Sequence, residues 1–360
     1  MRGSIRQLLD LVESGLVPPE GFLVEILSFT DSVDELFQAA DRFRDRFVGP
    51  EILVRGIVEF SNYCRNSCAY CGIGSRNRRI PRYRLSTQQV ICTVERIKDA
   101  GIKTVVLQSG EDPGLDPYWL ADLIKEIKSL GQMAVTLSVG ERSKDEYAIW
   151  RKAGADRYLL KVETTDPALY QSLHPGMRLE NRIRCLEVLR DLGYETGSGN
   201  IIGLPGQGPS QIARDLLFLR SFGLDMLAIG PFVPHPDTPL GGLEPGSMEQ
   251  TLRAIALARL LCPYCNIPAT SAIGTIGGDS ARRHALNAGA NVVMLNFTPW
   301  PYSSLYEIYP GRPGPDLAGK MLEGLMAWAD ENGREIRFSI GSARHSGCRA
   351  TEPDLFIRSN

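Results

Sequence analysis

The stretch ILVRGIVEFSNYCRNSCAYC, residues 52–71, joins a run of apolar residues to a loop that contains three cysteines. Its first part, residues 52–60, is rich in β-branched side chains and predicts a buried strand. Seven similar runs follow along the chain, and helix-like stretches separate them. The predicted strands span residues 52–60, 104–108, 133–138, 157–163, 196–202, 226–229, 267–272 and 291–295. The predicted helices between them span residues 88–100, 118–130, 144–153, 181–192, 210–222 and 248–261.

This alternation predicts a fold of the α/β class. Strands that alternate with helices pair in parallel through right-handed crossovers, and eight of them can close a (β/α)8 TIM barrel. Gly101, Gly154 and Gly289 stand where a helix gives way to the next strand, and glycine there provides the left-handed C-cap. A doubly wound open sheet is the alternative. We expect an N-terminal helical extension over residues 1–48, the barrel over residues 49–345 and a C-terminal tail over residues 346–360.

The composition is that of a globular protein without a strong overall charge. Of the 360 residues, 43% are hydrophobic and 23% are charged, and the formal net charge is -2. These values argue against a general attraction to nucleic acid or to an anionic membrane. The first residues lack the apolar core of a secretory signal, and no run of about 18 apolar residues predicts a membrane span. We therefore expect a cytoplasmic protein.

Polar residues stand where the predicted strands end, which is where function collects in a parallel barrel. Among them are Glu59, Gln108, Lys161, Glu163 and Asn200. Any strand must leave into a polar loop, so the pattern also has a purely structural interpretation. Carboxylates, amides and a lysine at so many strand ends nevertheless indicate the rim of a binding site.

Cys64, Cys68 and Cys71 follow the first predicted strand and therefore belong to this rim. Three thiolates in one loop can hold three corners of a cubane iron–sulfur cluster, and without a fourth cysteine nearby one iron stays open to another ligand. A structural zinc site needs four ligands, and neither a histidine nor a second CxxC adjoins the loop. The spacing therefore predicts an iron–sulfur cluster with an open iron.

The CxxxCxxC spacing, with Tyr70 before the last cysteine and a β/α barrel around it, resembles the radical S-adenosylmethionine (SAM) superfamily. The resemblance implies a 4Fe-4S cluster on the three cysteines and SAM chelated to the open iron, where it is cleaved to a 5′-deoxyadenosyl radical. Glu163 and Arg182 would bind the oppositely charged ends of SAM. The full set of SAM contacts that the resemblance implies is Tyr70, Ser109, Gly110, Glu111, Glu163, Arg182, Gly199, Ile201 and Gly203.

Longer stretches resemble one family within this superfamily, the FeFe-hydrogenase maturases called HydE. They include VVLQSGEDP (105–113), GADRYLLKVET (154–164), LGYETGSGNIIGLPGQ (192–207) and GANVVMLNFTPWPY (289–302), in the same order. The resemblance implies action on a small sulfur-linked organometallic iron species during maturation of the hydrogenase H-cluster, with catalytic roles for Tyr306 and Glu163. The substrate contacts that it implies are Thr136, Lys161, Met226, Thr270, Ser271 and Met294.

Several of these residues also have simpler interpretations. Met226 and Met294 can fill the barrel core, and Tyr306 can be an ordinary packed aromatic residue. Thr270 and Ser271 face opposite sides of their strand if it stays regular, so at most one of them then points inward.

The chain departs from the HydE pattern at Lys161-Val162-Glu163, where the family has Arg-His-Glu. Lysine keeps the positive charge of arginine but cannot make bidentate hydrogen bonds to planar anions. This departure concerns substrate recognition rather than SAM cleavage. Some family members carry a second cluster late in the chain, but no cysteine lies between Cys265 and Cys348, so we predict none. The cysteines that we interpret as packing or surface residues are Cys92, Cys185, Cys262, Cys265 and Cys348.

The residues around the cluster loop raise the question of partners. His235, in a proline-rich loop after the sixth strand, either reaches the cavity or shapes the loop. We expect a small-molecule substrate and contacts with other hydrogenase maturation proteins. The arginines of the loop predict either a docking patch for an acidic electron donor, a ferredoxin or flavodoxin, or a solvated surface. They are Arg65, Arg76, Arg78, Arg79, Arg82 and Arg84.

Other functions also fit parts of the sequence. A methylornithine synthase shares the barrel and would act on an amino acid, so lysine would stimulate SAM cleavage. A biotin synthase needs further cluster ligands on inner strands, and no other cysteine is placed to provide them. A non-catalytic iron–sulfur carrier would hold a cluster that is indifferent to SAM, and it leaves Glu163, Arg182 and residues 199–203 without a role.

Overall fold

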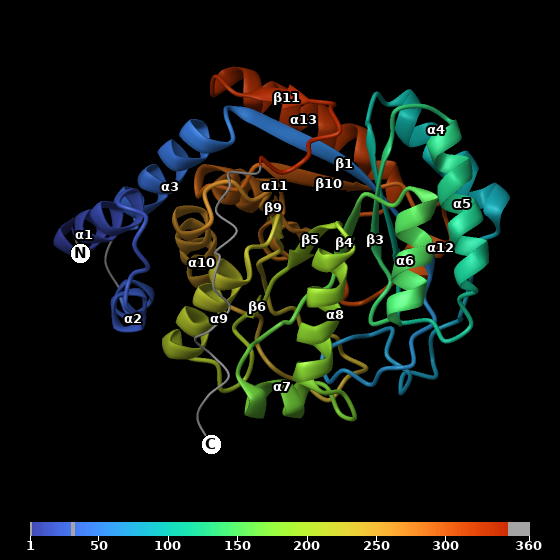
Figure 1. The fold of residues 1–360 in the computed structure, drawn as a ribbon, viewed down its shortest axis with the longest axis horizontal. Helices are drawn as coiled ribbons and strands as arrows, with labels where there is room; N and C mark the ends of the chain where they lie inside the picture. The colour runs from blue at the N-terminus through green and yellow to red at the C-terminus, as the bar shows by residue number, and fades with distance from the viewer. Residues whose placement is uncertain (1, 30–32, 345–360) are drawn as a thin grey trace.

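The computed structural model, which describes residues 2–29 and 33–344, is a β/α barrel with helices around a ring of parallel strands (Figure 1). The predicted fold class is confirmed. The predicted tail over residues 346–360 and Cys348 lie outside the described residues.

The barrel closes almost completely. Hydrogen bonding runs through the strands in the order β7-β5-β4-β3-β2-β1-β10-β9, and all of these pairs are parallel. A parallel bridge between Met226 and Asn266 joins the two ends of this order, which argues against an open sheet. The strands are β1 (Glu51–Ser61), β2 (Thr104–Ser109), β3 (Ala134–Ser138), β4 (Arg157–Leu159), β5 (Glu195–Ser198), β7 (Met226–Leu227), β9 (Pro268–Ala269) and β10 (Val292–Asn296).

Short strands add to this ring at both of its ends. β6 (Ile201–Ile202) and β8 (Gly230–Pro231) pair with each other and extend the wall formed by β5 and β7 toward the carboxyl end. β11 (Glu335–Arg337) pairs with the beginning of β1 at the opposite end.

The helices cover the outside of the barrel, and the six predicted ones are found with ends that differ by at most two residues. The N-terminal helices form a further layer, in which α2 packs on α9 and α3 on α10 (Figure 1). The helices are α1 (Arg2–Glu13), α2 (Glu20–Ser28), α3 (Asp34–Phe47), α4 (Thr87–Asp99), α5 (Pro117–Ser129), α6 (Lys144–Ala153), α7 (Pro167–Leu173), α8 (Leu179–Asp191), α9 (Pro209–Phe222), α10 (Met248–Leu261), α11 (Ser271–Asn287), α12 (Tyr302–Leu305), the 3-10 turn η1 (Pro315–Leu317) and α13 (Ala318–Glu331).

Local sequence signals explain where these elements begin and end. Ser86 and Ser143 form capping boxes at the first residues of α4 and α6, so that side chains satisfy backbone N–H groups there. Gly101, Gly154 and Gly289 have φ angles of 79°, 110° and 103°. The left-handed turns predicted at these three glycines are therefore confirmed.

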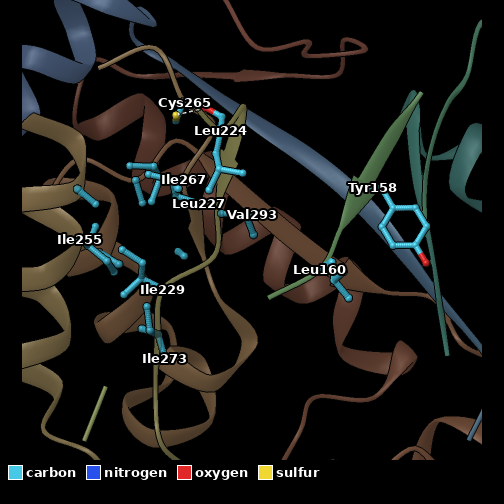
Figure 2. Packing of buried hydrophobic residues seen from close by; sticks show 14 of the residues in the cluster. Tyr158, Leu160, Leu224, Leu227, Ile229, Ile255, Cys265, Ile267, Ile273 and Val293 are labelled. Atoms are coloured by element: carbon cyan, nitrogen blue, oxygen red, sulfur yellow. Dashed lines mark hydrogen bonds between the residues drawn. The ribbon is translucent and has the colours of Figure 1, made fainter. Parts of the chain in front are cut away.

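The hydrophobic core lies between the outer faces of the strands and the surrounding helices. Figure 2 shows part of it, where Leu227, Ile229 and Ile267 pack toward Ile255 of α10. Burial of such apolar side chains is the main contribution to stability. Among the described residues, no helix is both long and apolar enough to cross a membrane.

Four predicted strands end earlier than expected, those over residues 157–163, 196–202, 226–229 and 267–272. Two of these changes affect the site. The predicted strand 267–272 stops at Ala269, because Thr270 takes the N-cap position of α11 and Ser271 begins that helix. The expectation that at most one of these two side chains points inward assumed a regular strand, which the structure does not have here. The predicted strand 157–163 pairs regularly only through Leu159, and it rejoins the sheet as a single bridge at Glu163.

Candidate active site

The carboxyl ends of the strands open onto a cavity of about 310 Å³. The cysteine loop forms one side of it, and most of the predicted site residues meet there. The four that do not line it are Thr136, Gly199, Gly203 and Met226. Those that do are Cys64, Cys68, Cys71, Tyr70, Ser109, Gly110, Glu111, Lys161, Glu163, Arg182, Ile201, Thr270, Ser271, Met294 and Tyr306.

The cysteine loop is held in shape by Arg82, which the sequence placed in a surface patch. Its half-buried guanidinium donates hydrogen bonds of 2.5 to 3.0 Å to four backbone carbonyl oxygens, those of Asn62, Ile73, Gly74 and Asn77. The loop also receives support from Gly110, because a Cβ atom there would lie 2.3 Å from the carbonyl oxygen of Tyr63. The three thiols are therefore presented by a rigid backbone.

Burial raises the pKa of all three thiols in this loop. The pKa of Cys71 rises to about 12, first because of burial and then because Cys64 lies close by. Burial also raises the pKa of Cys64 and of Cys68, and Cys71 and Cys64 add to the effect on Cys68. Three buried thiols with raised pKa values keep their protons unless nearby positive charge stabilises the thiolates. The irons of a cluster supply that charge, so this donor set fits an iron–sulfur cluster.

The arrangement does not resemble a site for one metal ion. Among residues 2–29 and 33–344, no three His, Cys, Asp or Glu side chains converge as ligands of a single ion do. A cubane cluster binds each thiolate to a different iron, so its ligands need not converge.

His174 lines the same cavity, but its two ring nitrogens are already engaged. Its Nδ1 lies 3.1 Å from the carbonyl oxygen of Tyr170, and its Nε2 lies 2.9 Å from the hydroxyl of Tyr70. The carbonyl can only accept, so Nδ1 carries the proton and the hydroxyl of Tyr70 donates to Nε2. Burial lowers the pKa of His174 to about 4, which keeps the ring neutral. This histidine, which the sequence did not single out, fixes the aromatic residue of the cluster motif.

Glu163 adopts a backbone conformation that is rare for its residue type. Its φ angle is 65°, and among the described residues it is the one non-glycine residue with a positive φ. Such conformations cost about 1–3 kcal/mol and occur at functional sites. The carboxylate lies in the cavity wall, with Oε2 2.8 Å from Nζ of Lys161.

Two further ion pairs lie on the side of the cysteine loop. Nε of Arg182 is 2.8 Å from Oε1 of Glu141, and Arg65 is 2.6 Å from Oε1 of Glu111. Burial acts against the charge of Arg182, but Tyr170, Glu141 and Glu111 outweigh it and raise the pKa of Arg182. Arg182 therefore stays positively charged. Its counter-ion, Glu141, was not predicted from the sequence.

The glycines after β5 serve the packing of the wall. A Cβ atom on Gly199 would lie 2.0 Å from the carbonyl oxygen of Ala228, and one on Gly203 would lie 2.3 Å from Cα of Gly246. The resemblance implies that these glycines contact SAM, and in the structure they allow two backbone segments to approach each other. Ile201, which lies between them, is the member of this element that lines the cavity.

Thr136 and Met226 lie one layer below the cavity. Thr136 stands two residues before the lining residue Ser138 on β3 and so shares its face, and Met226 begins β7, two residues before the lining residue Ala228. Sδ of Met226 is 3.2 Å from Nη1 of Arg55, a buried arginine of β1. These two predicted substrate contacts therefore belong to the barrel interior beneath the site.

The structure also places the residues at which the chain departs from the family. Val162 is 0% exposed, packs in the hydrophobic core and does not line the cavity. His235 is buried against Gly72, where its Nδ1 accepts a hydrogen bond from the N–H of Asp237. His235 does not line the cavity and thus shapes the loop.

Most arginines of the cluster loop have structural partners. Arg84 makes hydrogen bonds of 2.7 Å to both carboxylate oxygens of Asp112, and Arg79 is 2.7 Å from Asp237. Together with the contacts of Arg65 and Arg82, they account for four of the six. The remaining two are exposed, and they are Arg76 and Arg78.

The other cysteines that the structure describes do not line the cavity. Cys92 is exposed on α4, and Cys185 is half-buried on α8. Cys265 is buried after α10, and its thiol donates to the carbonyl oxygen of Leu224 at 2.8 Å (Figure 2). This contact gives Cys265 a packing role.

Arg312 is a cavity residue without a local sequence signal. Its guanidinium is paired with the buried carboxylate of Glu59 and donates to the carbonyl oxygen of Tyr306 at 2.6 Å. It also lies over the rings of Tyr306 and Tyr309. Arg312 thus ties the segment after α12 to the end of β1 and holds Tyr306 at the cavity.

Known proteins resemble this chain in sequence. Residues 58–219 match the radical SAM superfamily. The chain is 47% identical over 311 residues to the [FeFe] hydrogenase maturase subunit HydE of Thermotoga maritima, which covers 85% of this chain and 88% of that protein. It is 30% identical over 269 residues to 3-methylornithine synthase of Methanosarcina acetivorans, with 74% and 75% covered.

Solved structures show the same barrel. The crystal structure of methylornithine synthase (PylB) superposes with a TM-score of 0.79 at 26% identity, and covers 92% of this chain and 97% of that one. The FeFe-hydrogenase maturase HydG from Carboxydothermus hydrogenoformans gives 0.78 at 19% identity, with 94% and 80% covered, a likeness of fold alone.

Proposed function

Because the chain belongs to the radical SAM superfamily and to its HydE family, we propose that it is a hydrogenase maturase whose cavity holds a cluster, SAM and a small substrate together. The observation that carries this proposal is that three cysteine thiols line one cavity together with the guanidinium of Arg182 and the carboxylate of Glu163, whose backbone is strained. When bound, the cluster supplies the electron that cleaves the sulfonium bond of SAM.

The residues of the chain would bind and orient SAM. Cys64, Cys68 and Cys71 would hold three irons and leave the fourth to SAM. An amino acid ligand carries an ammonium and a carboxylate group, and Glu163 and Arg182 offer the opposite charges in the same wall. These roles are supported by burial, because charged groups out of bulk water attract each other more strongly.

Tyr306 would face SAM and substrate as a neutral hydroxyl. Its side chain is 1% exposed, and burial raises its pKa, so that it keeps its proton at neutral pH. A neutral phenol can donate a hydrogen bond to a bound ligand. The buried groups around it would also keep water from a radical.

The lower part of the cavity would take a small anionic species, such as a sulfur-linked iron compound that carries carbon monoxide and cyanide. Lys161 offers a compact positive charge there in place of a planar guanidinium. Thr270 and Ser271 offer hydroxyl donors, and Met294 offers a polarizable sulfur. An iron–sulfur cluster and free cysteine thiols are both typical of proteins in a reducing compartment, which supports a cytoplasmic location.

An acidic electron donor, a ferredoxin or flavodoxin, would dock beside the cysteine loop. Arg76 and Arg78 are exposed and, within the described chain, are not paired with a carboxylate as Arg65, Arg79 and Arg84 are, so their charges would steer a negatively charged partner. The other four arginines are engaged within the chain, so the docking patch is smaller than the sequence indicated.

The experiment that tests this function is anaerobic reconstitution of the cluster, followed by dithionite and SAM. The wild-type protein should form 5′-deoxyadenosine or an adenosylated product, whereas Cys68→Ser should form neither. Cys92→Ser is the matched control, since this exposed cysteine lies on α4 away from the cavity and should leave the reaction unchanged. A reconstituted cluster that does not respond to SAM would contradict the proposal and favour an iron–sulfur carrier.

A methylornithine synthase is the second candidate, favoured by the TM-score of 0.79 and the 30% identity to such enzymes. It would act on an amino acid. Stimulation of 5′-deoxyadenosine formation by lysine would therefore support it over a maturase.

A further inference from the structure

Asp215 of α9 has a buried carboxylate that hydrogen-bonds to two segments at the carboxyl end of the barrel. Its side chain belongs to a residue that is 0% exposed. Oδ1 accepts hydrogen bonds from both the N–H and the hydroxyl of Thr165, each at 2.6 Å. Oδ2 accepts from Nδ2 of Asn200 at 3.4 Å. One carboxylate therefore joins the segment after β4 to the segment after β5.

Both of these segments hold Glu163 in its strained conformation. Glu163 and Asn200 form a parallel bridge. The N–H of Glu163 donates to the carbonyl oxygen of Gly199 at 3.0 Å, and its own carbonyl accepts from Ile201 at 3.0 Å. A positive φ persists in a glutamate only where the surroundings fix it from several sides. Asp215 supplies two of these constraints, one through Thr165 and one through Asn200.

The carboxylate of Asp215 does not serve stability at neutral pH. Burial raises its pKa to about 6, although Thr165, Asn200 and Thr164 all donate hydrogen bonds to it. The ionised group is therefore less favourable in the fold than in the unfolded chain. A neutral side chain of the same size would fill this place at lower cost, so a different role accounts better for the acid.

We propose that Asp215 is a positioning residue for SAM, which holds Glu163 left-handed and so directs its carboxylate into the cavity. This inference rests on the proposed function, in which Glu163 contacts SAM. Asp215 itself does not line the cavity and acts through the backbone of residues 163–165 and through Asn200. The two carboxylate oxygens accept from four donors, which are the N–H and hydroxyl of Thr165, the hydroxyl of Thr164 and Nδ2 of Asn200. An amide of the same shape has only one accepting oxygen.

The test is a titration of the reduced, reconstituted protein with SAM, followed by the change in the electron paramagnetic resonance spectrum of the cluster. Asp215→Asn keeps one acceptor for Thr165 but turns an amide donor toward the amide of Asn200. Loss of an outer contact that orients a metal ligand typically weakens metal affinity or activity roughly 10- to 100-fold, and we expect an effect of similar size for a contact that orients Glu163. We expect SAM affinity to fall by about tenfold or more, with the cluster content unchanged.

Asp156→Asn is the matched control. Asp156 is an acid at the opposite end of the barrel, where Oδ2 accepts from the N–H of Val135 at 2.7 Å and pairs with Lys128. Its loss should lower stability without any change in SAM affinity. Asp215→Asn should show the reverse, with weaker SAM binding and no loss of stability at neutral pH.

A variant that exchanges the two partners separates positioning from other effects. Asp215→Asn combined with Asn200→Asp restores one donor and one acceptor between these residues, and SAM affinity should return to within about threefold of wild type. Wild-type affinity in Asp215→Asn, or no recovery in the exchange variant, would overturn the inference. A wild-type protein whose spectrum ignores SAM would instead overturn the proposed function, and the inference with it.

Discussion

The two ends of the barrel both bury charged and polar groups, but they treat them differently. At the amino end, the guanidinium of Arg259 donates to the carbonyl oxygens of Gly289, Pro263 and Cys265 and to Oδ1 of Asn291, at 2.8 to 2.9 Å. At the carboxyl end, Nε of Arg312 and the hydroxyl of Thr270 have no hydrogen-bond partner within the described part of the chain. Nε of Arg55 and the hydroxyl of Thr136, one layer below the cavity, share this property.

The difference separates stability from function within one fold. Buried polar groups are almost always satisfied, so the satisfied amino end is what folding alone requires. Atoms left without partners lower stability, and they persist where another molecule is to be bound. The strained residue, Glu163, also lies at the carboxyl end. The comparison therefore predicts that equivalent substitutions at the two ends have different consequences.

The largest effect is expected at the amino end, for Arg259→Met. The substitution removes the donor to four buried acceptors, and such a loss costs about 3–5 kcal/mol. Urea unfolding should show this decrease in the free energy of unfolding, while SAM affinity of the folded protein should stay within about twofold of wild type. An Arg259→Met protein that is as stable as wild type but binds SAM more weakly would contradict the assignment of stability to the amino end and ligand binding to the carboxyl end.

The second effect is a difference in pH dependence between two buried acids. The carboxyl of Asp215 titrates near 3.8 when unfolded and near 6 in the fold. Between these values the folded state keeps a proton that the unfolded state has lost, so its contribution to stability is present below about pH 3.8 and is lost as the pH rises through 6. Relative to wild type, Asp215→Asn should gain on the order of 3 kcal/mol between about pH 4 and pH 7.

Glu195 at the amino end provides the opposite case. Burial acts to raise its pKa, but Arg157 at 2.8 Å outweighs burial, and the pKa of Glu195 lies below its usual value. Its contribution is therefore present above about pH 4.5 and is lost as the pH falls. Glu195→Gln should lose stability relative to wild type as the pH rises. Unfolding curves for both variants across this range should show slopes of opposite sign.

Much of this fold follows from local sequence, because its signals are local. Capping residues such as Ser86 and Ser143 mark helix starts within a few residues, and glycines such as Gly154 mark their ends. The cysteine spacing likewise lies within one loop. These features need no knowledge of the tertiary structure.

The supporting residues of the site could not be predicted in this way. His174 acts on Tyr70 from 104 positions away, and Arg312 acts on Glu59 from 253. No pattern within one segment indicates such pairs. The predicted strand over residues 267–272 was too long for a related reason, because α11 begins at Ser271 and interrupts it.

A smaller effect is expected for one substitution made at both ends, threonine to valine. The hydroxyl of Thr104, at the amino end, donates to the carbonyl oxygen of Ile340 at 2.9 Å and accepts from Arg157 at 3.4 Å. Thr104→Val should therefore lower the free energy of unfolding by about 1–2 kcal/mol. Thr270→Val removes a hydroxyl that lacks a partner within the described chain, and should raise it by about 0.5–1 kcal/mol. Equal losses in both variants would contradict the comparison.

The smallest effect is expected at the surface, where the two ends differ in the partner that they meet. Arg76→Gln with Arg78→Gln removes two exposed charges beside the cysteine loop, and should slow reduction by an acidic electron donor by about three- to tenfold at low salt. The difference should shrink at high ionic strength, because salt screens exposed charges. Lys98→Gln with Lys103→Gln is the matched control, since these exposed residues lie where α4 ends and β2 begins, at the amino end. Stopped-flow reduction of the cluster measures both pairs, and equal slowing would mean that net charge, rather than this patch, governs the encounter.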